Sequence, residues 1–161
     1  MGVEESVDDR RRRRRLAVTV RENMRELTAQ LALLNHQVGQ RLEMRDVDLD
    51  CLDIISRHGP LGASALARTA GLHPATMTGI LDRLEKGGWI VRERDPQDRR
   101  AVVVRASRER GAQVYELYSG MNSSMEELLD GYDESQLEVL VDFLARARAA
   151  GVVATDDLAR G

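Results

Sequence analysis

One face of the segment between residues 73 and 86 combines small, hydroxyl and basic side chains, the types that contact nucleic acids. Met77, Ile80, Leu81 and Leu84 recur at i, i+3, i+4 and i+7, so a helix here would bury their face in a core. The opposite face is then exposed, and its small residues would let the helix backbone enter a DNA major groove, which is about 12 Å wide. We therefore predict that six residues of this helix contact DNA: His73, Ala75, Thr76, Thr78, Gly79 and Arg83.

Two members of this set have alternative roles. His73 precedes Pro74 at the expected N-cap, where a helix N-terminus favours anions and a phosphate could bind. A histidine at this position can equally well cap the helix or face solvent. Arg83 lies more than a turn further on, where it can reach a phosphate. Alternatively, it pairs with Asp82 or with a neighbour of Glu85.

A second basic group lies in a loop between two short segments rich in β-branched residues. Asp98 stands two residues before Arg100, which suggests a carboxylate that holds the guanidinium in one rotamer while its fork points outward. An arginine preorganised in this way can enter a narrow minor groove, and either Arg99 or Arg100 could be the inserted residue. Arg92 and Arg94 would brace the loop or touch the DNA backbone. The alternative for all four arginines is a solvated surface ladder. The predicted DNA contacts of this loop are Arg94, Asp98, Arg99 and Arg100.

These groups need two helices and a ribbon to position them. Gly71 supplies the tight turn before the DNA-contacting helix, and Pro74 opens that helix at its first position. This order of elements predicts a winged helix-turn-helix. The expected elements are a helix from Asp48 as N-cap to His58, a short strand at 61–62, helices over 63–70 and 74–86, and strands over 89–94 and 101–105.

Helices with long apolar seams flank this region on both sides. Ser107 is the expected N-cap of one of them, and Asp133 with Gln136 forms a capping box at the start of the last. Together the seams offer more apolar helix surface than one small head can cover, so we predict a homodimer. The seams run from Val20 to Val38, from Val114 to Leu128 and from Leu137 to Leu144.

The predicted fold is therefore mostly α: a winged helix-turn-helix with a small antiparallel β-wing and long N- and C-terminal dimerisation helices. Arg10 to Arg15 are like charges that repel one another, so we expect a disordered or frayed N-terminal arm. The alternative is an arm that touches DNA phosphates or a minor groove. The predicted divisions are the arm at 1–15, an N-terminal dimerisation helix at 16–47, the DNA-binding domain at 48–107, C-terminal dimerisation helices at 108–150 and a flexible tail at 151–161.

The net charge of −3 conceals an uneven distribution. Residues 57–108 carry ten Lys and Arg against five Asp and Glu, whereas residues 109–161 carry four against eleven. Positive charge is concentrated where we expect phosphates to bind, so the net charge is a poor guide to the partner.

No apolar run approaches the roughly 20 residues of a membrane span, and no signal peptide is evident. With one cysteine, the sequence fits a reducing compartment, and we expect a soluble cytoplasmic protein without a membrane partner.

Cysteine and histidine are the remaining side chains that could do chemistry. Cys51 lies among apolar residues, which favours a small buried thiol. His36, His58 and His73 show no metal-ligand spacing with Cys51, so we expect no metal site. The sequence lacks a Gly-rich phosphate loop, a nucleophile elbow and paired carboxylates, which argues against an enzyme and against a resident cofactor.

An ordered series of short motifs runs through about 45 residues of the sequence. It consists of Ser64-Ala65-Leu66-Ala67, Gly71-Leu72, Thr76-Met77-Thr78, Leu81-Asp82-Arg83-Leu84-Glu85, Gly88-Trp89-Ile90, Arg94-Asp95, and Asp98-Arg99-Arg100 before a Val-rich strand. In this series the sequence resembles the MarR (multiple antibiotic resistance regulator) family of transcription factors. The resemblance departs from the family pattern at Gly62 and His73, where capping hydroxyls or carboxylates are more usual, and at Gly79, where some relatives carry a larger base-reading side chain.

The resemblance implies a homodimer whose terminal helices interlock and whose two heads read a pseudo-palindromic operator in double-stranded DNA. Such regulators usually repress transcription, and many release DNA when a small aromatic or lipophilic effector occupies the crevice between head and dimer region. His36 and Cys51 are the candidate crevice residues, with a surface histidine and a buried thiol as their alternatives. The alternative function is a protein-interaction module, resembling an antirepressor, that keeps the winged helix without reading DNA.

Overall fold

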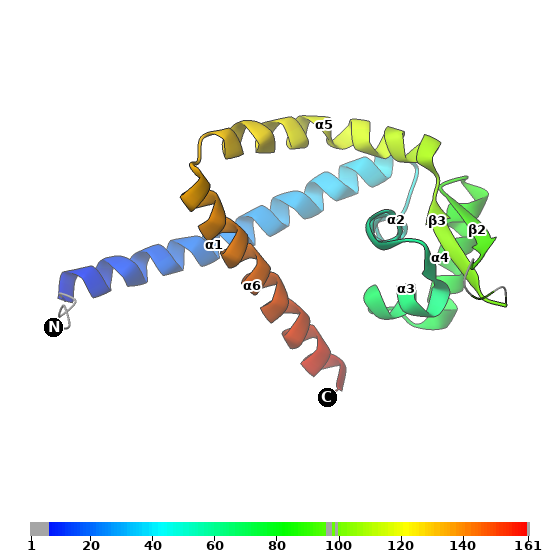
Figure 1. Cartoon of the computed structure of the whole chain (residues 1–161), viewed down its shortest axis with the longest axis horizontal. Coiled ribbons are helices and arrows are strands. Elements are labelled where there is room, and N and C mark those ends of the chain that lie inside the picture. Colours follow the sequence, from blue (N-terminus) through cyan, green and yellow to red (C-terminus); the bar gives the residue numbers. More distant parts are fainter. Residues whose placement is uncertain (1–6, 96–97, 99, 161) are drawn as a thin grey trace. The chain divides into compact units, whose positions relative to one another are not determined.

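A computed structural model describes residues 7–95, 98 and 100–160 (Figure 1). The chain divides after Tyr115 into two compact units. The fold is mostly α-helical with one small antiparallel sheet, which confirms the predicted class. The elements are α1 Val7–Arg41, α2 Asp46–His58, β1 Leu61–Gly62, α3 Ala63–Thr69, α4 Pro74–Lys86, β2 Ile90–Arg94, β3 Val102–Ala106, α5 Arg108–Asp130 and α6 Glu134–Arg160.

The core of the first unit lies between α2, α3, α4 and the sheet. Met77, Ile80, Leu81 and Leu84 are at most 2% exposed, so the face of α4 that the sequence spacing identifies is the buried one. Each large apolar side chain buried in this way contributes about 1.5–3 kcal/mol to folding. One face of α4 is thus attached to the core, and the other is left to solvent. The same cluster includes Ile55, Leu66, Ile90 and Val104.

The wing ribbon consists of β2 and β3, which pair antiparallel with Arg92 opposite Val104. The predicted short strand β1 pairs with the other edge of β3, so the strand order is β1-β3-β2. Side chains alternate between the two faces of a strand, and Ile90, Arg92 and Arg94 therefore share one face. Because Ile90 is buried in the core, this is the face of β2 that is directed toward the core and α4.

Gly71 and Gly88 form the tight turns on either side of α4. Their φ angles are +65° and +71°. This left-handed region is open to glycine because glycine has no Cβ to clash with the backbone. Gly71 turns the chain between α3 and α4, as predicted, and Gly88 turns it into β2.

Helix α1 begins earlier than the sequence pattern predicts. Residues 7–15, assigned to a disordered or frayed arm, are helical. Arginine is a strong helix former, and Asp8 and Asp9 in the first turn interact favourably with the helix dipole. These effects outweigh the mutual repulsion of the six arginines. Residues 1–6 of the predicted arm lie outside the described residues.

Helix α2 also begins earlier than predicted, at Asp46. Its N-cap is Arg45, whose side chain makes no capping hydrogen bond. Asp48, the predicted N-cap, lies inside the helix and is only 4% exposed. A capping rule considers only local sequence, whereas the partner that Asp48 finds lies in another helix.

The second unit consists of most of α5 together with α6. The predicted capping box is present: the Gln136 N–H donates to Asp133 Oδ1 at 3.0 Å, and the Asp133 N–H donates to Gln136 Oε1 at 2.9 Å. Helix α6 continues to Arg160, so residues 151–160 of the predicted flexible tail are helical. Four alanines directly precede this stretch, at 145, 147, 149 and 150, and favour a helix that continues into it. Across α5 and α6, as described, no residue is buried.

None of the described helices is both long enough and apolar enough to cross a membrane.

Candidate nucleic-acid interface

The N-terminal half of α4 presents small and hydroxyl groups to solvent. Ala75, Thr76 and Thr78 are exposed, and Gly79 is half-buried. Thr78 Oγ1 donates to the Pro74 carbonyl at 3.2 Å, which holds the hydroxyl against the helix. No bulky side chain stands on this part of α4, so a groove could approach its backbone closely.

His73 caps α4. Its Nδ1 accepts a hydrogen bond from the Ala75 N–H at 3.2 Å, and Pro74 follows at the first helical position. Of the alternatives for His73, the structure shows the cap, and contact with a phosphate stays a prediction.

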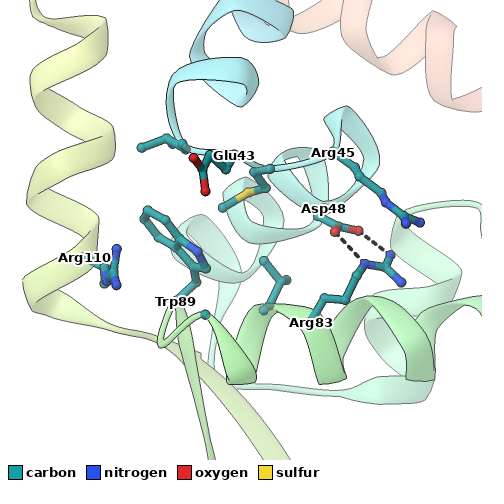
Figure 2. A pocket seen from close by; sticks show the side chains of 10 residues that line it. Glu43, Arg45, Asp48, Arg83, Trp89 and Arg110 are labelled. Atoms are coloured by element: carbon teal, nitrogen blue, oxygen red, sulfur yellow. Dashed lines mark hydrogen bonds and ion pairs between the residues drawn. The ribbon is translucent and has the colours of Figure 1, made fainter.

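Arg83 is bound to Asp48 of α2. Its Nε and Nη2 donate to the two carboxylate oxygens of Asp48 at 2.8 and 2.6 Å (Figure 2). Hydrogen bonding to Asp48 is the main reason that the pKa of Arg83 is raised. The guanidinium, predicted to reach a phosphate or a neighbour on α4, therefore turns toward α2. The buried carboxylate explains the difference, because an unpaired charge inside a protein costs several kcal/mol.

Asp48 is a residue of the site that the sequence prediction missed. It stands at i, i+3, i+4 and i+7 with Cys51, Leu52 and Ile55, all of which are at most 4% exposed. It therefore lies on the apolar face of α2. An acidic residue at such a position requires a cationic partner. This signal is present in the sequence, although the identity of the partner is not.

Arg92 on β2 binds two carboxylates of α4. Its Nη2 donates to Asp82 Oδ1 and its Nη1 donates to Glu85 Oε2, each at 2.6 Å. The hydrogen bond to Asp82, followed by the charges of Glu85 and Asp82, raises the pKa of Arg92. Of the two roles considered for Arg92, a brace or a DNA contact, this geometry is that of a brace between the wing and α4.

Backbone hydrogen bonds around Asp98 close the wing loop. The Asp95 N–H donates to the Ala101 carbonyl at 3.0 Å, and the Ala101 N–H donates to the Asp98 carbonyl at 2.9 Å. The Asp98 carboxylate, predicted to hold the Arg100 guanidinium, accepts instead from the Arg100 backbone N–H at 3.0 Å. Aspartate favours this bond because its short side chain reaches the backbone two residues on. Arg94 is exposed at the base of the loop.

Arg99, the other candidate for insertion into the minor groove, lies outside the described residues, as do residues 96–97.

A pocket of about 330 Å³ lies beside the Asp48–Arg83 pair (Figure 2). Both members of the pair line it, together with Trp89, Arg110 and the α1–α2 connection at 42–45. The Arg110 guanidinium lies 4.7 Å from the centroid of the Trp89 ring, a cation–π contact. The pocket thus offers an aromatic side chain and several charged groups.

The predicted crevice residues, His36 and Cys51, do not line this pocket. His36 Nδ1 lies 2.9 Å from Asp46 Oδ2, and Gln40 Nε2 lies 2.9 Å from His36 Nε2, so the ring joins α1 to α2. Cys51 is fully buried, and burial, followed by the charge of Asp48, raises its pKa to about 11. The walls of the pocket come from separate segments of the chain, which leave no local pattern in the sequence.

Within the described part of the chain, no group of three or more His, Cys, Asp or Glu side chains is arranged to hold a metal ion.

The comparisons with known proteins agree with this geometry. The MarR family model matches residues 46–102, which extend from α2 to the start of β3. YcgE of Bacillus subtilis (strain 168), named as an uncharacterised HTH-type transcriptional regulator, is 32% identical over 138 residues, which are 86% of this chain and 90% of YcgE. The chain belongs to the MarR family.

Solved MarR-family structures share the fold. A MarR family protein from Bacillus stearothermophilus, 17% identical, superposes with a TM-score of 0.65 over 86% of this chain and 97% of its own. A MepR variant of S. aureus, solved bound to an oligodeoxyribonucleotide, is 19% identical, with a TM-score of 0.54 over 81% and 96% of the two chains. The segment that matches the MarR model includes Asp48, Arg83 and Arg92, the residues that hold α4 in place.

Proposed function

We propose that this MarR-family chain is a homodimeric regulator that binds a pseudo-palindromic site in double-stranded DNA, and that it represses transcription until a small effector releases it. The observation that carries the proposal is the exposed face of α4 beside an arginine-bearing wing. YcgE is named as a transcriptional regulator, and the MepR variant was solved with an oligodeoxyribonucleotide, which supports the same role for this chain.

Helix α4 would enter the major groove with its N-terminal half, the part that contacts base edges in helix-turn-helix proteins. Hydroxyls can bind bases or phosphates, and small residues permit close approach of the backbone. His73, at the helix N-terminus, would add a phosphate contact. The proposed base-contacting surface consists of Ala75, Thr76, Thr78 and Gly79.

The wing would contact the DNA backbone and the adjacent minor groove through Arg94 and Arg100. Arginine suits this role because a narrow minor groove attracts positive charge and a guanidinium fits its width. Arg83 is better assigned to holding α4 than to a phosphate, because its fork is bound to Asp48.

Exposed apolar side chains support the homodimer. Leu27, Leu128 and Leu144, one from each predicted seam, are 47%, 60% and 58% exposed in the single chain. Soluble monomers rarely leave contiguous apolar patches in water. A second copy would cover such seams, and a two-fold dimer would place its heads on two half-sites related by the same symmetry. Sedimentation analysis should therefore give twice the mass of one chain, and a monomer at all concentrations would contradict the proposal.

Selection from a random duplex pool, followed by fluorescence anisotropy, tests DNA binding. Thr78→Ala should weaken binding to the selected site more than binding to random DNA, whereas Arg100→Ala should weaken both. The affinity of the wild type should fall with salt by about 0.9 log units per log unit of salt for each phosphate neutralised. Thr155→Ala is a matched control, because Thr155 makes the same contact to a carbonyl four residues earlier in α6. Failure of the wild type to bind any sequence at about 50 mM salt would favour the protein-interaction alternative.

The pocket beside the Asp48–Arg83 pair is the proposed effector site. Its volume of about 330 Å³ is near the lower limit for small-molecule sites. A ligand there would contact α4 through Arg83 and Leu84, so its binding could change the position of α4. A thermal-shift screen of small aromatic and lipophilic compounds, on the wild type and Arg110→Gln, tests this, because a ligand selective for the folded state raises its stability. Compounds that stabilise both proteins equally, or none that stabilise the wild type, would contradict this site.

A further inference from the structure

We infer that Arg92 is a positioning residue that fixes the wing against the recognition helix α4, so that the two meet DNA as one rigid unit. The inference rests on the proposed DNA binding. It goes further by assigning a role to three charged residues that contact no proposed ligand.

The contact is a single guanidinium that joins two elements. Asp82 and Glu85 are three residues apart on α4 and so lie on the same side of the helix. Arg92 donates to both of them from β2, and each distance is 2.6 Å. Figure 1 shows β2 beside α4. A lysine could not replace this planar fork, because its ammonium is a single point of attachment.

The position of Arg92 within β2 makes the contact relevant to the wing. Arg94 follows on the same strand face, and the strand then leads directly into the loop that carries Asp98 and Arg100. A fixed direction for β2 at Arg92 therefore fixes the direction in which the loop leaves the head.

A second anchor holds α4 on its other side. Arg83 is bound to Asp48 of α2, and it stands between Asp82 and Glu85 in the sequence. Asp82, Arg83 and Glu85, three charged residues in the C-terminal half of α4, thus attach the helix, while its N-terminal half is presented to solvent. This division places the structural contacts and the proposed DNA contacts at opposite ends of one helix.

Arg92 differs from a phosphate-binding arginine in its charge surroundings. Both of its amino groups are bound to carboxylates, and the cluster of Asp82, Glu85 and Arg92 carries one more negative than positive charge. If only charge mattered, neutralising Asp82 and Glu85 would tighten DNA binding. A positioning role for Arg92 predicts weaker binding instead, because a wing that is no longer fixed to α4 must be ordered when DNA binds.

The test compares wild type, Arg92→Gln and the double variant Asp82→Asn with Glu85→Gln by anisotropy over a range of salt. We expect both variants to bind the selected DNA about tenfold more weakly, because the freed wing must be ordered on binding. The salt slope should stay at the wild-type value, whereas Arg100→Ala should reduce it by about one phosphate equivalent. Wild-type or tighter affinity of the double variant, or a reduced slope for Arg92→Gln, would overturn the inference.

Arg105→Gln is the matched control. Arg105 also donates to a carboxylate, that of Glu93, but on the ribbon face opposite Arg92 and within the ribbon itself. Its loss removes the same charge and one ion pair without touching α4. We expect its affinity to stay within about twofold of the wild type once one charge is allowed for.

Hydrogen exchange of the free protein supplies a readout that does not depend on DNA. The N–H groups of Asp95 and Ala101, which close the wing loop, should exchange faster in Arg92→Gln than in Arg105→Gln, with amides of α2 unchanged. Equal exchange in the two variants would overturn the inference even if the wild type binds no DNA. Conversely, failure of wild-type binding alone would contradict the proposed function and leave this measurement valid.

Discussion

Asp48 and Arg83 lie 35 positions apart and form a bidentate ion pair between α2 and α4, with distances of 2.8 and 2.6 Å. The side chain of Asp48 is buried, whereas that of Arg83 is 40% exposed. The pair adds a directional polar contact to the apolar face that holds α4 in the core. Because α4 carries the proposed DNA-contacting surface, loss of this pair is expected to affect both stability and DNA binding.

Replacement of Arg83 by methionine should lower the free energy of unfolding by about 2 kcal/mol, because the Asp48 carboxylate stays buried without a partner. Water reaches Arg83, so the loss should be smaller than for a fully buried pair. The double variant Asp48→Leu with Arg83→Met should recover most of it, since apolar groups then replace both partners. Urea denaturation of the two single variants and the double variant gives the coupling energy. A coupling energy near zero would contradict the role assigned to the pair.

Gly79→Ala should stabilise the protein and weaken its binding to DNA. A Cβ at this position would lie 3.5 Å from Arg83 Nη1, an ordinary contact, so alanine fits and should add about 0.5–1 kcal/mol through its higher helix propensity. The same methyl group would stand between the α4 backbone and a base. Urea denaturation and anisotropy measure the two effects separately.

Gly111→Ala is the control for this prediction, because Gly111 lies in α5 and a Cβ there would meet nothing within 4 Å. It should stabilise the protein to a similar extent and leave the affinity for DNA unchanged. If Gly79→Ala bound the selected site as tightly as Gly111→Ala, the close approach proposed for the α4 backbone would be wrong.

The features that follow from local spacing were predictable from the sequence. The buried face of α4 follows from the spacing of Met77 to Leu84, because a helix places those positions on one side whatever surrounds it. The cap at His73 and the capping box at Asp133 depend on residues within three positions of one another.

The features that depend on tertiary contacts were not predictable in this way. Asp48 has the sequence signature of a helix cap, yet its partner lies 35 positions away, and only the packing of α2 against α4 brings the two together. Asp98 was assigned to the correct neighbour, but to the guanidinium of Arg100 rather than its backbone. For the pocket, His36 and Cys51 were chosen by residue type, whereas its walls are set by how separate segments pack.

The thiol of Cys51 should resist alkylation in the native protein. It is fully buried, and burial raises its pKa to about 11, so little thiolate is present near neutral pH. Iodoacetamide should label it slowly in buffer and rapidly in urea, with mass spectrometry as the measurement. Equal rates in the two conditions would show that the thiol is accessible.

The same thiol should make the protein less stable at alkaline pH. Because the pKa of Cys51 is higher in the folded state, the free energy of unfolding should fall as pH rises from about 9 toward about 11, and Cys51→Ala should reduce that fall.

The start of α6 should show a dependence on acid pH that one carboxylate controls. Asp133 Oδ1 accepts from Ser135 Oγ at 2.7 Å and from the Gln136 N–H at 3.0 Å, and these bonds, that of Ser135 first, lower the pKa of Asp133. The folded state therefore holds this proton less tightly than the unfolded chain does. The stabilisation is complete above the unfolded pKa of about 4 and is lost as pH falls through the lower folded value.

Asp133→Asn keeps an oxygen that accepts the capping bonds but removes the titrating group. The melting temperature of the wild type should therefore fall more than that of Asp133→Asn between about pH 5 and about pH 3, as followed by far-ultraviolet circular dichroism. Glu138→Gln controls for the loss of one negative charge from α6, because Glu138 is exposed and lies beyond the capping box. Its pH profile should parallel the wild type. If Asp133→Asn and Glu138→Gln changed the profile equally, general charge rather than the cap would determine the acid sensitivity of this helix.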